Sequence, residues 1–350
     1  MRALTYSAPQ AVPVVAELPD PSPPAGGAVV RVAATGLCRS DWHGWMGHDD
    51  DIARFPHVPG HEFAGVVSSV GEGVDPSWVG RRVTAPFVQA CGACPTCAGG
   101  DGQVCPHQRQ PGFTDPGSFA EQVVVHAATT NLVALPETVD DATAAALGCR
   151  VATAYRAVVS RARAVEGETV LVLGCGGVGL AAIQVGAARG ARVCAVDPDA
   201  GSRDRALAVG AEVALDGSDP ETVLEHLSDW SDGGVHVALD AVGSPSTCRT
   251  GVLALRRRGR HVQVGLLPPA AGSPEVPMDR VIGRELDVLG SHGMAAHEYP
   301  ALLVDVASGR LDLHALLAPQ DPVALADAGP LLSAMGDTPS RGVVVIDPSR

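Results

Sequence analysis

The fold is indicated most clearly by the sequence Thr169-Val170-Leu171-Val172-Leu173-Gly174-Cys175-Gly176-Gly177-Val178-Gly179. Its first five residues have the length and composition of a buried strand, and a Gly-x-Gly-x-x-Gly turn follows them. The small residues at 180–190 predict a helix, and residues 192–196 predict a second strand that ends at Asp197, eighteen residues after Gly179. Strand, glycine turn, helix, strand and acid in this order are typical of a dinucleotide-binding βαβ unit.

Each part of this unit has a chemical role. The glycines permit a tight turn and a close approach of the pyrophosphate, the N–H groups at the helix start hold phosphates, and Asp197 accepts the ribose hydroxyls. A carboxylate there repels a 2′-phosphate, so we predict that NAD is preferred to NADP, and Arg203 is the one nearby cation that could reverse this. The predicted cofactor-binding residues of this unit are Gly174, Gly176, Gly177, Val178, Gly179, Asp197 and Arg203.

Strands and helices continue to alternate after this unit. Further strands are predicted at residues 212–215, 235–240, 261–265 and 286–290. Together with the first two they make six, the number that a doubly wound parallel sheet of two βαβαβ halves requires. Arg256-Arg257-Arg258 falls where a helix should end, which would suit the helix dipole. A helix at 300–308 and a closing strand at 342–346 are predicted to return to the first domain.

Composition limits the possible functions of the 350-residue chain. Its length suits two domains, and 46% hydrophobic with 18% charged residues indicates a globular protein. No apolar run is long enough for a membrane span, and no signal peptide is evident, so we expect a cytoplasmic protein. A formal net charge of −14 argues against nucleic acid and anionic membranes as partners. All 25 basic residues are Arg, which excludes Schiff-base chemistry and Tyr-x-x-x-Lys dyads.

The nine cysteines are expected to bind metal or to be buried as thiols rather than to form disulfides. Four of them, Cys91, Cys94, Cys97 and Cys105, lie in a glycine-rich loop that has no apolar core to bury them. A closed tetrahedral zinc site explains this spacing and would be structural, because no ligand position remains for a substrate. An iron–sulfur cluster is the alternative.

A second metal site is predicted around the stretch Gly36-Leu37-Cys38-Arg39-Ser40-Asp41-Trp42-His43. A thiolate suits zinc, and two further ligands would leave the fourth position open for chemistry. His61 and Cys149 are the candidates. Glu62 next to His61 is a candidate catalytic residue, as a carboxylate behind the ligands or as a transient ligand. The structural alternative is a small buried Cys38 and a hydrogen-bonded core His61.

Taken as a set, these residues resemble the zinc-dependent alcohol dehydrogenases of the medium-chain dehydrogenase/reductase superfamily over essentially the whole chain. The resemblance implies a GroES-like β-rich catalytic domain at residues 1–150 with both zinc sites, a Rossmann cofactor-binding domain at 151–292, and a return to the catalytic domain at 293–350. Cys38, His61 and Cys149 then correspond to the catalytic zinc ligands, and the loop cysteines to the structural zinc lobe. Departures from the family pattern are Arg39, where many bacterial members carry Gly, and Cys175 in the glycine turn.

The resemblance also implies roles around the metal. Ser40 and His43 match the proton-relay hydroxyl and histidine, and Asp41 matches the carboxylate behind the metal-binding His. Arg39 matches a pyrophosphate contact, Thr153 a residue beside the nicotinamide, and Phe87 a residue of the substrate pocket. The expected function is hydride transfer between an alcohol and NAD, with a dimer or tetramer as the expected assembly. A polyol, formaldehyde or enoyl-type reductase and a non-catalytic dinucleotide-binding protein are the alternatives. The physiological substrate and the roles of Cys175, Cys194 and Cys248 stay open.

Overall fold

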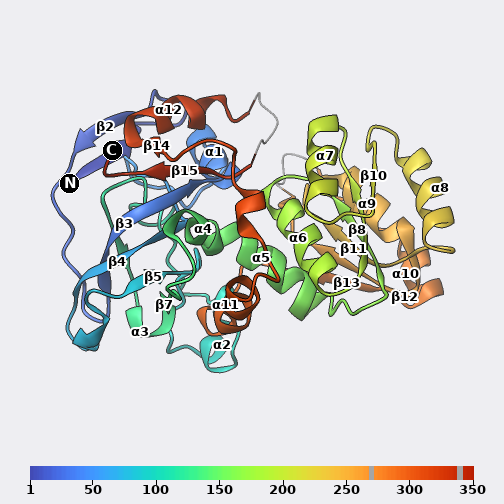
Figure 1. Cartoon of the computed structure of the whole chain (residues 1–350), viewed down its shortest axis with the longest axis horizontal. Coiled ribbons are helices and arrows are strands. Elements are labelled where there is room, and N and C mark those ends of the chain that lie inside the picture. The colour runs from blue at the N-terminus through green and yellow to red at the C-terminus, as the bar shows by residue number, and fades with distance from the viewer. Residues whose placement is uncertain (268–271, 337–341) are drawn as a thin grey trace. The chain divides into compact units, whose positions relative to one another are not determined.

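The structure, a computed structural model, describes residues 1–267, 272–336 and 342–350 (Figure 1). The chain divides into two compact units. The first consists of Met1–Ala152, Gly293–Gly309 and Leu317–Arg350, and the second of Thr153–His292 and Arg310–Leu316. Within the described residues, no helix is both long and apolar enough to cross a membrane.

A seven-stranded sheet forms the centre of the first unit (Figure 1). Its strands are, in spatial order, β14 (Val323–Ala324), β15 (Val344–Asp347), β3 (Ala28–Leu37), β4 (Phe63–Val70), β5 (Arg82–Thr84) and β7 (Val133–Ala134), with β6 (Gln122–Val125) paired to β3. All pairings are antiparallel except that of β14 with β15. Strand β3 is ten residues long, mostly buried, and ends at Leu37. It therefore delivers Cys38 directly at the end of a buried strand.

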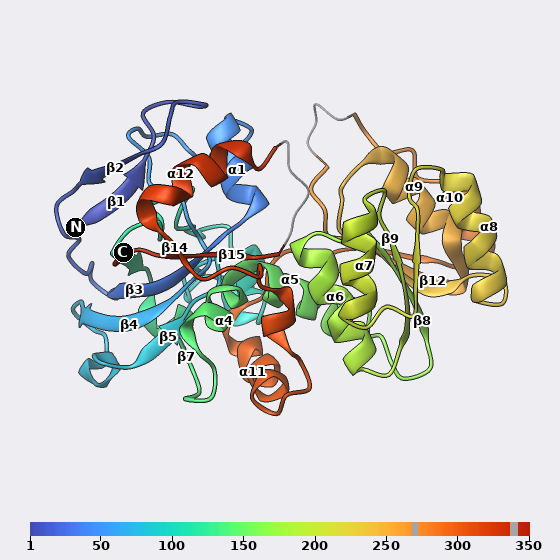
Figure 2. The same cartoon turned by 45° about the horizontal axis from the view of Figure 1, so that its top comes forward.

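Short helices and a separate hairpin complete the first unit. The hairpin pairs β1 (Arg2–Thr5) with β2 (Val14–Glu17) in antiparallel register. Helix α12 (Leu325–Ala334) packs against α1 (Arg39–Met46), as Figure 2 also shows, and it buries Leu325 and Leu332 in a cluster with Leu4 and Ile346. The helices of this unit are α1 (Arg39–Met46), α2 (Pro95–Ala98), α3 (Ala128–Asn131), α4 (Asp141–Ala145), α11 (Tyr299–Ala307) and α12 (Leu325–Ala334), with the single turns η1 (Pro76–Trp78), η2 (Gly102–Val104), η3 (Leu147–Val151) and η6 (Ala296–Glu298).

A six-stranded parallel sheet forms the centre of the second unit. Its spatial order is β10 (Val213–Leu215), β9 (Arg192–Val196), β8 (Thr169–Leu173), β11 (Val235–Asp240), β12 (Leu255–Gln263) and β13 (Asp287–Gly290). This is the order of a doubly wound sheet, so the predicted fold class is confirmed. The helices are α5 (Ala152–Arg156), α6 (Gly177–Ala188), α7 (Ala200–Ala208), α8 (Pro220–Trp230), α9 (Pro245–Ala254) and α10 (Met278–Arg284), with the turns η4 (Ala157–Arg161) and η7 (Leu313–Leu316).

The expectation for Arg256-Arg257-Arg258 was wrong. Helix α9 ends at Ala254, and the three arginines already belong to β12, because an irregular register between β11 and β12 accommodates them. The carbonyls at the end of α9 are instead met by two other guanidinium groups. Arg280 Nη2 donates to Leu253 O over 2.9 Å, and Arg284 Nη1 donates to Leu255 O over 2.7 Å. Helix α10 therefore supplies the cations that suit this helix end.

Candidate active site and metal centres

The end of β3 and the start of α1 place Cys38 and Asp41 together. Asp41 is buried, and its Oδ2 accepts from the backbone N of Cys38 over 2.8 Å, which closes the first turn of α1. Oδ1 accepts from Gly60 N at 3.1 Å and from His61 Nδ1 at 2.9 Å. One carboxylate thus positions two of the predicted metal ligands, which come from different parts of the chain.

The remaining nitrogen of His61, Nε2, is the clearest indication of a metal site. His61 is fully buried, and Nε2 has no hydrogen-bond partner among the described residues. A buried polar atom without a partner is costly unless something else binds it. Ligand atoms of Cys38, His61, Glu62 and Cys149 all lie within 4.8 Å of one another. Two sulfurs and an imidazole nitrogen at this separation fit a zinc ion, which favours such ligands.

The charges in this cluster also fit a bound cation. The Cys38 thiol has a pKa well below its ordinary value, because Cys149 donates a hydrogen bond and Arg150 and His61 lie nearby, while burial opposes the shift. The pKa of Cys149 is raised because its proton is shared with Cys38 and because it is desolvated. For His61, burial lowers the pKa, but Asp41 and Cys38 outweigh burial and raise it overall. A divalent cation here would replace the protons that the cluster otherwise retains.

Glu62 forms a buried ion pair with Arg150, which the sequence analysis did not find. Glu62 Oε1 accepts from Arg150 N at 2.7 Å, Oε2 accepts from Arg150 Nε at 2.8 Å, and Arg150 Nη2 also contacts Oε2. Arg150 Nη2 donates to Leu37 O at 2.8 Å, so the pair joins the end of β3, the residue before β4 and the η3 turn. Burial raises the pKa of Glu62 to about 6, although Arg150 opposes this. A Cβ atom on Gly36 would lie 2.8 Å from Glu62 Oε2, which explains a glycine at that position.

Cys149 lies on a π-helical turn that other segments hold in place. The backbone N of Phe87 donates to Gly148 O at 3.0 Å, and Tyr299 Oη donates to Leu147 O at 3.1 Å. Such π-turns are frequent at functional sites. The rings of Phe87 and Phe113 lie 6.1 and 5.2 Å from that of His61. The predicted pocket residue Phe87 is therefore beside the cluster, and Phe113 is an aromatic neighbour that the sequence analysis missed.

The relay candidates lie on the first turns of α1. Ser40 Oγ is 3.9 Å from Cys38 Sγ, and His43 is half-buried. In the described part of the chain no hydrogen bond joins Ser40 to His43, so a relay between them requires bridging groups. Arg39 does not lie free: its guanidinium contacts Met335 O and stacks over Trp42 with its Cζ 4.5 Å from the ring centroid.

The four loop cysteines form a second, separate cluster around α2 and η2. Their sulfurs lie within 4.8 Å of one another, with 3.4 Å between Cys94 and Cys97, 3.7 Å between Cys94 and Cys105, and 3.9 Å between Cys91 and Cys97. None forms a disulfide. A tetrahedron with metal–sulfur bonds of about 2.3 Å has edges of about 3.8 Å. These separations fit a single tetrahedral ion and leave no room for an iron–sulfur cluster.

The glycine turn of the second unit fits a dinucleotide phosphate. A Cβ atom on Gly179 would lie 1.8 Å from Gly174 O, so α6 can start this close to β8 only with glycine there. By contrast, a Cβ atom on Gly176 would meet nothing within 4 Å, which leaves exposed backbone open to a ligand at the N-terminus of α6. Thr153 is buried, and its Oγ1 has no hydrogen-bond partner within the described ranges.

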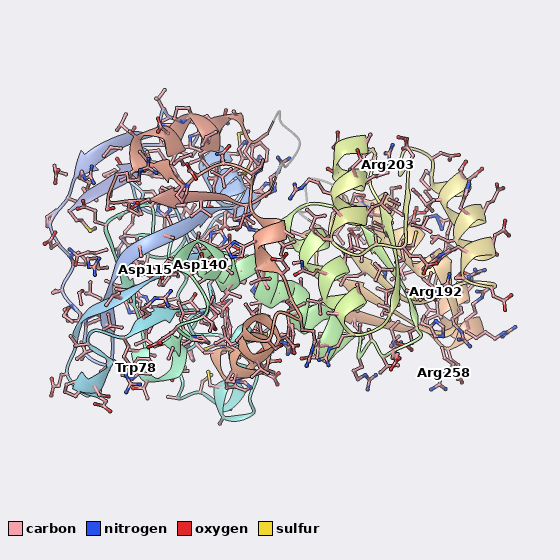
Figure 3. The ribbon with its side chains drawn as sticks, in the orientation of Figure 1. Trp78, Asp115, Asp140, Arg192, Arg203 and Arg258 are labelled. Carbon is pink, nitrogen blue, oxygen red and sulfur yellow. The ribbon has the colours of Figure 1, made fainter. Side chains whose placement is uncertain are left out.

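The acid at the end of β9 is held in a fixed orientation. Asp197 Oδ2 accepts from Cys175 N at 2.8 Å, and Oδ1 accepts from Asp199 N at 2.9 Å. Arg203, on α7 and labelled in Figure 3, donates from Nη1 to Asp197 O at 2.8 Å and to Pro198 O at 2.9 Å. Its Nη1 also lies 3.5 Å from Asp216 Oδ2. The guanidinium is therefore bound to backbone carbonyls and to a carboxylate.

Comparisons with known proteins agree with this geometry. Residues 24–137 match the alcohol dehydrogenase GroES-like domain, and residues 177–308 match the zinc-binding dehydrogenase family. The sorbitol dehydrogenase of Halalkalibacterium halodurans is 33% identical over 82% of this chain and 83% of its own length. Alcohol dehydrogenase TADH from Thermus sp. ATN1 superposes with a TM-score of 0.90 at 29% identity over 99% of both chains. An alcohol dehydrogenase (rspB) from E. coli CFT073, solved with NADH, superposes with a TM-score of 0.87 at 27% sequence identity over 99% of both chains. The chain belongs to the zinc-type alcohol dehydrogenase family of the medium-chain dehydrogenases/reductases.

Proposed function

We propose that this protein is a zinc-dependent, NAD-preferring dehydrogenase that transfers a hydride between the carbinol carbon of an alcohol and the nicotinamide. The observation that carries the proposal is the buried cluster of Cys38, His61 and Cys149, in which His61 Nε2 has no other partner among the described residues. In this proposal residues 1–150 and 293–350 act as the catalytic domain, and residues 151–292 bind the cofactor.

Zinc held by Cys38, His61 and Cys149 would act as a Lewis acid on the substrate oxygen. Asp41 accepts the Nδ1 proton of His61, and this tautomer would leave the lone pair of Nε2 available to hold the ion. Glu62 is held by Arg150 and balances the positive charge behind the ligands. Ser40, 3.9 Å from Cys38 Sγ, would take the hydroxyl proton of the substrate, and His43 would receive it on the way to solvent.

The second cluster is proposed to hold a structural zinc ion. Cys91, Cys94, Cys97 and Cys105 provide four thiolates, so no position remains for a substrate. The ion would stabilise a loop that contains little apolar surface of its own, and its contribution would be to stability rather than to chemistry.

The substrate class is proposed from the side chains near the cluster. Phe87 and Phe113 flank the His61 ring, which favours an alcohol with an apolar group next to the carbinol carbon. The sorbitol dehydrogenase relative makes a polyol the second candidate. NAD preference is supported by Asp197 and by the engagement of Arg203 with carbonyls and Asp216. The family resemblance supports a homo-oligomer, dimer or tetramer, and the cytoplasmic location stays a prediction from the sequence.

The proposal is tested by assaying purified protein with NAD against primary, secondary, aromatic and polyol alcohols, together with elemental analysis. We expect two zinc ions per chain and NADH formation that is lost in Cys38→Ala while the fold, followed by circular dichroism, is kept. Folded protein that carries full zinc but reduces NAD with no alcohol in the panel would contradict the proposed activity.

A further inference from the structure

A second histidine lies against His43. Helix α1 ends at Met46, and Gly47 adopts a left-handed conformation (φ 81°) that reverses the chain, so that His48 N donates to His43 O over 3.0 Å. This reversal brings the Nδ1 atoms of the two imidazoles to 3.1 Å. Both rings also contact Trp42 edge-on, with centroids 4.9 Å and 5.8 Å away. The pair is therefore fixed by backbone and by an aromatic neighbour.

Two nitrogens at 3.1 Å form a hydrogen bond only if one donates and the other accepts. A neutral imidazole carries one N–H, so one ring of the pair holds its proton on Nδ1 and the other on Nε2. A proton that arrives at Nε2 of His43 can then be balanced by loss of the Nδ1 proton to His48. Since His43 is half-buried and His48 is exposed, this transfer moves the charge outward.

We propose that His48 is the outer carrier of the proton relay, which accepts the proton from Nδ1 of His43 and releases it to solvent. The proposal rests on the proposed dehydrogenase function and on its relay through Ser40 and His43. No other atom is oxidised or reduced in this step, because one N–H bond breaks as another forms.

The charges around the pair favour transfer in this direction. Burial, Arg39 and His48 together lower the pKa of His43, and Cys38 opposes them, so positive charge is disfavoured on the inner ring. On the solvent side of the pair, three acidic residues, Asp49, Asp50 and Asp51, follow His48 in the sequence. Helix α12, which packs against α1, carries a single charged residue, Asp327, which is also an acid.

The experiment compares the holoenzyme with His48→Ala and His48→Gln in single-turnover stopped flow, in which NADH absorbance and proton release to a pH indicator are recorded together. The glutamine variant can still hydrogen-bond to His43 Nδ1 but cannot carry a proton. In wild-type enzyme we expect proton release to keep pace with NADH formation. In both variants proton release should lag by about threefold or more in dilute buffer, and imidazole should restore it, because a terminal relay group supplies less than the full 10²–10⁴-fold of general acid–base catalysis.

His226→Ala is the matched control, because His226 is an exposed histidine on α8 whose Nδ1, among the described residues, bonds only to Thr222 O of its own helix. This variant should behave as wild type. Ser40→Ala distinguishes failure of the whole proton relay from failure of the role proposed for His48. If Ser40→Ala slows turnover while both His48 variants release protons without lag, His48 is not a carrier and the inference is wrong. If Ser40→Ala also leaves proton release and turnover unchanged, the relay itself is wrong and the inference falls with it.

Discussion

His61 Nδ1 lies 2.9 Å from Asp41 Oδ1, and neither side chain is accessible to solvent. The same carboxylate accepts from the backbone N of Cys38 and of Gly60. A single buried charge therefore fixes the start of α1, the loop before β4 and the orientation of an imidazole. Carboxylates in this position fix the tautomer of a metal-binding histidine and raise its basicity.

Asp41→Asn should therefore weaken metal binding at the three-ligand site. The amide keeps the size of the side chain but removes its charge, and we expect an affinity loss of about 10- to 100-fold. Chelator competition that follows zinc release per chain measures this, and the four-cysteine site supplies an internal control because it should release its ion as in wild type. Unchanged release from both sites would show that Asp41 does not act through His61.

The Glu62–Arg150 pair gives a stability prediction. Arg150→Met leaves a buried carboxylate without its partner, which should lower the free energy of unfolding by roughly 3–5 kcal/mol. The double variant Glu62→Gln with Arg150→Met removes both charges and should recover much of this loss. Denaturant unfolding of the zinc-loaded proteins measures the free energy of unfolding of the single and the double variant. A double variant no more stable than Arg150→Met would contradict the electrostatic explanation.

The contrast between Asp197 and Arg150 shows what the sequence could reveal. The position of Asp197 is predictable because its distance from the glycine turn is set by one helix and one short strand, both local in sequence. The presence of six strands in the parallel sheet follows from the same alternation of strands and helices. The chemistry of Cys38, His61 and Cys149 makes them candidate ligands, but only the family resemblance groups them as one site, since Cys149 follows His61 by 88 positions and no spacing in the sequence predicts that contact.

Arg150 could not be predicted because its partner Glu62 is 88 residues away and depends on how η3 meets β3 and β4. Its only signal was its position directly after Cys149. Arg256-Arg257-Arg258 lie inside β12 although such a run of cations is typical of a helix end, because no loop separates the end of α9 from the start of β12. The His43–His48 contact depends on the left-handed Gly47, which the sequence alone does not reveal.

The loop cysteines should affect stability rather than catalysis. Cys97→Ala removes one of four sulfurs and should reduce zinc from two ions to one per chain, with activity kept at low temperature. The thermal midpoint should fall by at least about 5 °C, because losing a few kcal/mol has that effect in a chain of this size. Cys248→Ala is the control, since Cys248 is buried outside both clusters and should leave zinc content at two. A Cys97→Ala protein with two zinc ions would exclude the proposed site.

Acid should weaken an ion cluster at Asp115, which Figure 3 labels. Burial opposes ionisation of this carboxyl, but bonds from His126, Arg109 and Thr114 outweigh burial and lower its pKa. Its contribution is therefore present above the unfolded pKa of about 3.9 and is lost as pH falls below it. Asp115→Asn should cost about 1–3 kcal/mol at pH 7, and the difference from wild type should shrink between about pH 4 and pH 3. Denaturant unfolding of both proteins across this pH range measures the difference in free energy of unfolding. A difference that does not change with pH would refute the ionic explanation.

Cofactor preference should depend on Asp197 and on the pair that restrains Arg203. Two unit charges about 4 Å apart interact by roughly 4 kcal/mol at an effective dielectric near 20, so even a partly screened clash of Asp197 with a 2′-phosphate should favour NAD by at least about tenfold in kcat/KM. Asp197→Ala should narrow the ratio of kcat/KM for NAD to that for NADP.

Asp216→Asn should narrow the same kcat/KM ratio by a different route, because Arg203 would lose its carboxylate partner at 3.5 Å and become available to the 2′-phosphate of NADP. Asp229→Asn, an exposed acid on α8, is the control and should leave the ratio unchanged. A wild-type kcat/KM for NADP equal to or above that for NAD would refute the role of Asp197. An Asp216→Asn ratio equal to wild type would show that the backbone carbonyls of Asp197 and Pro198 alone hold Arg203.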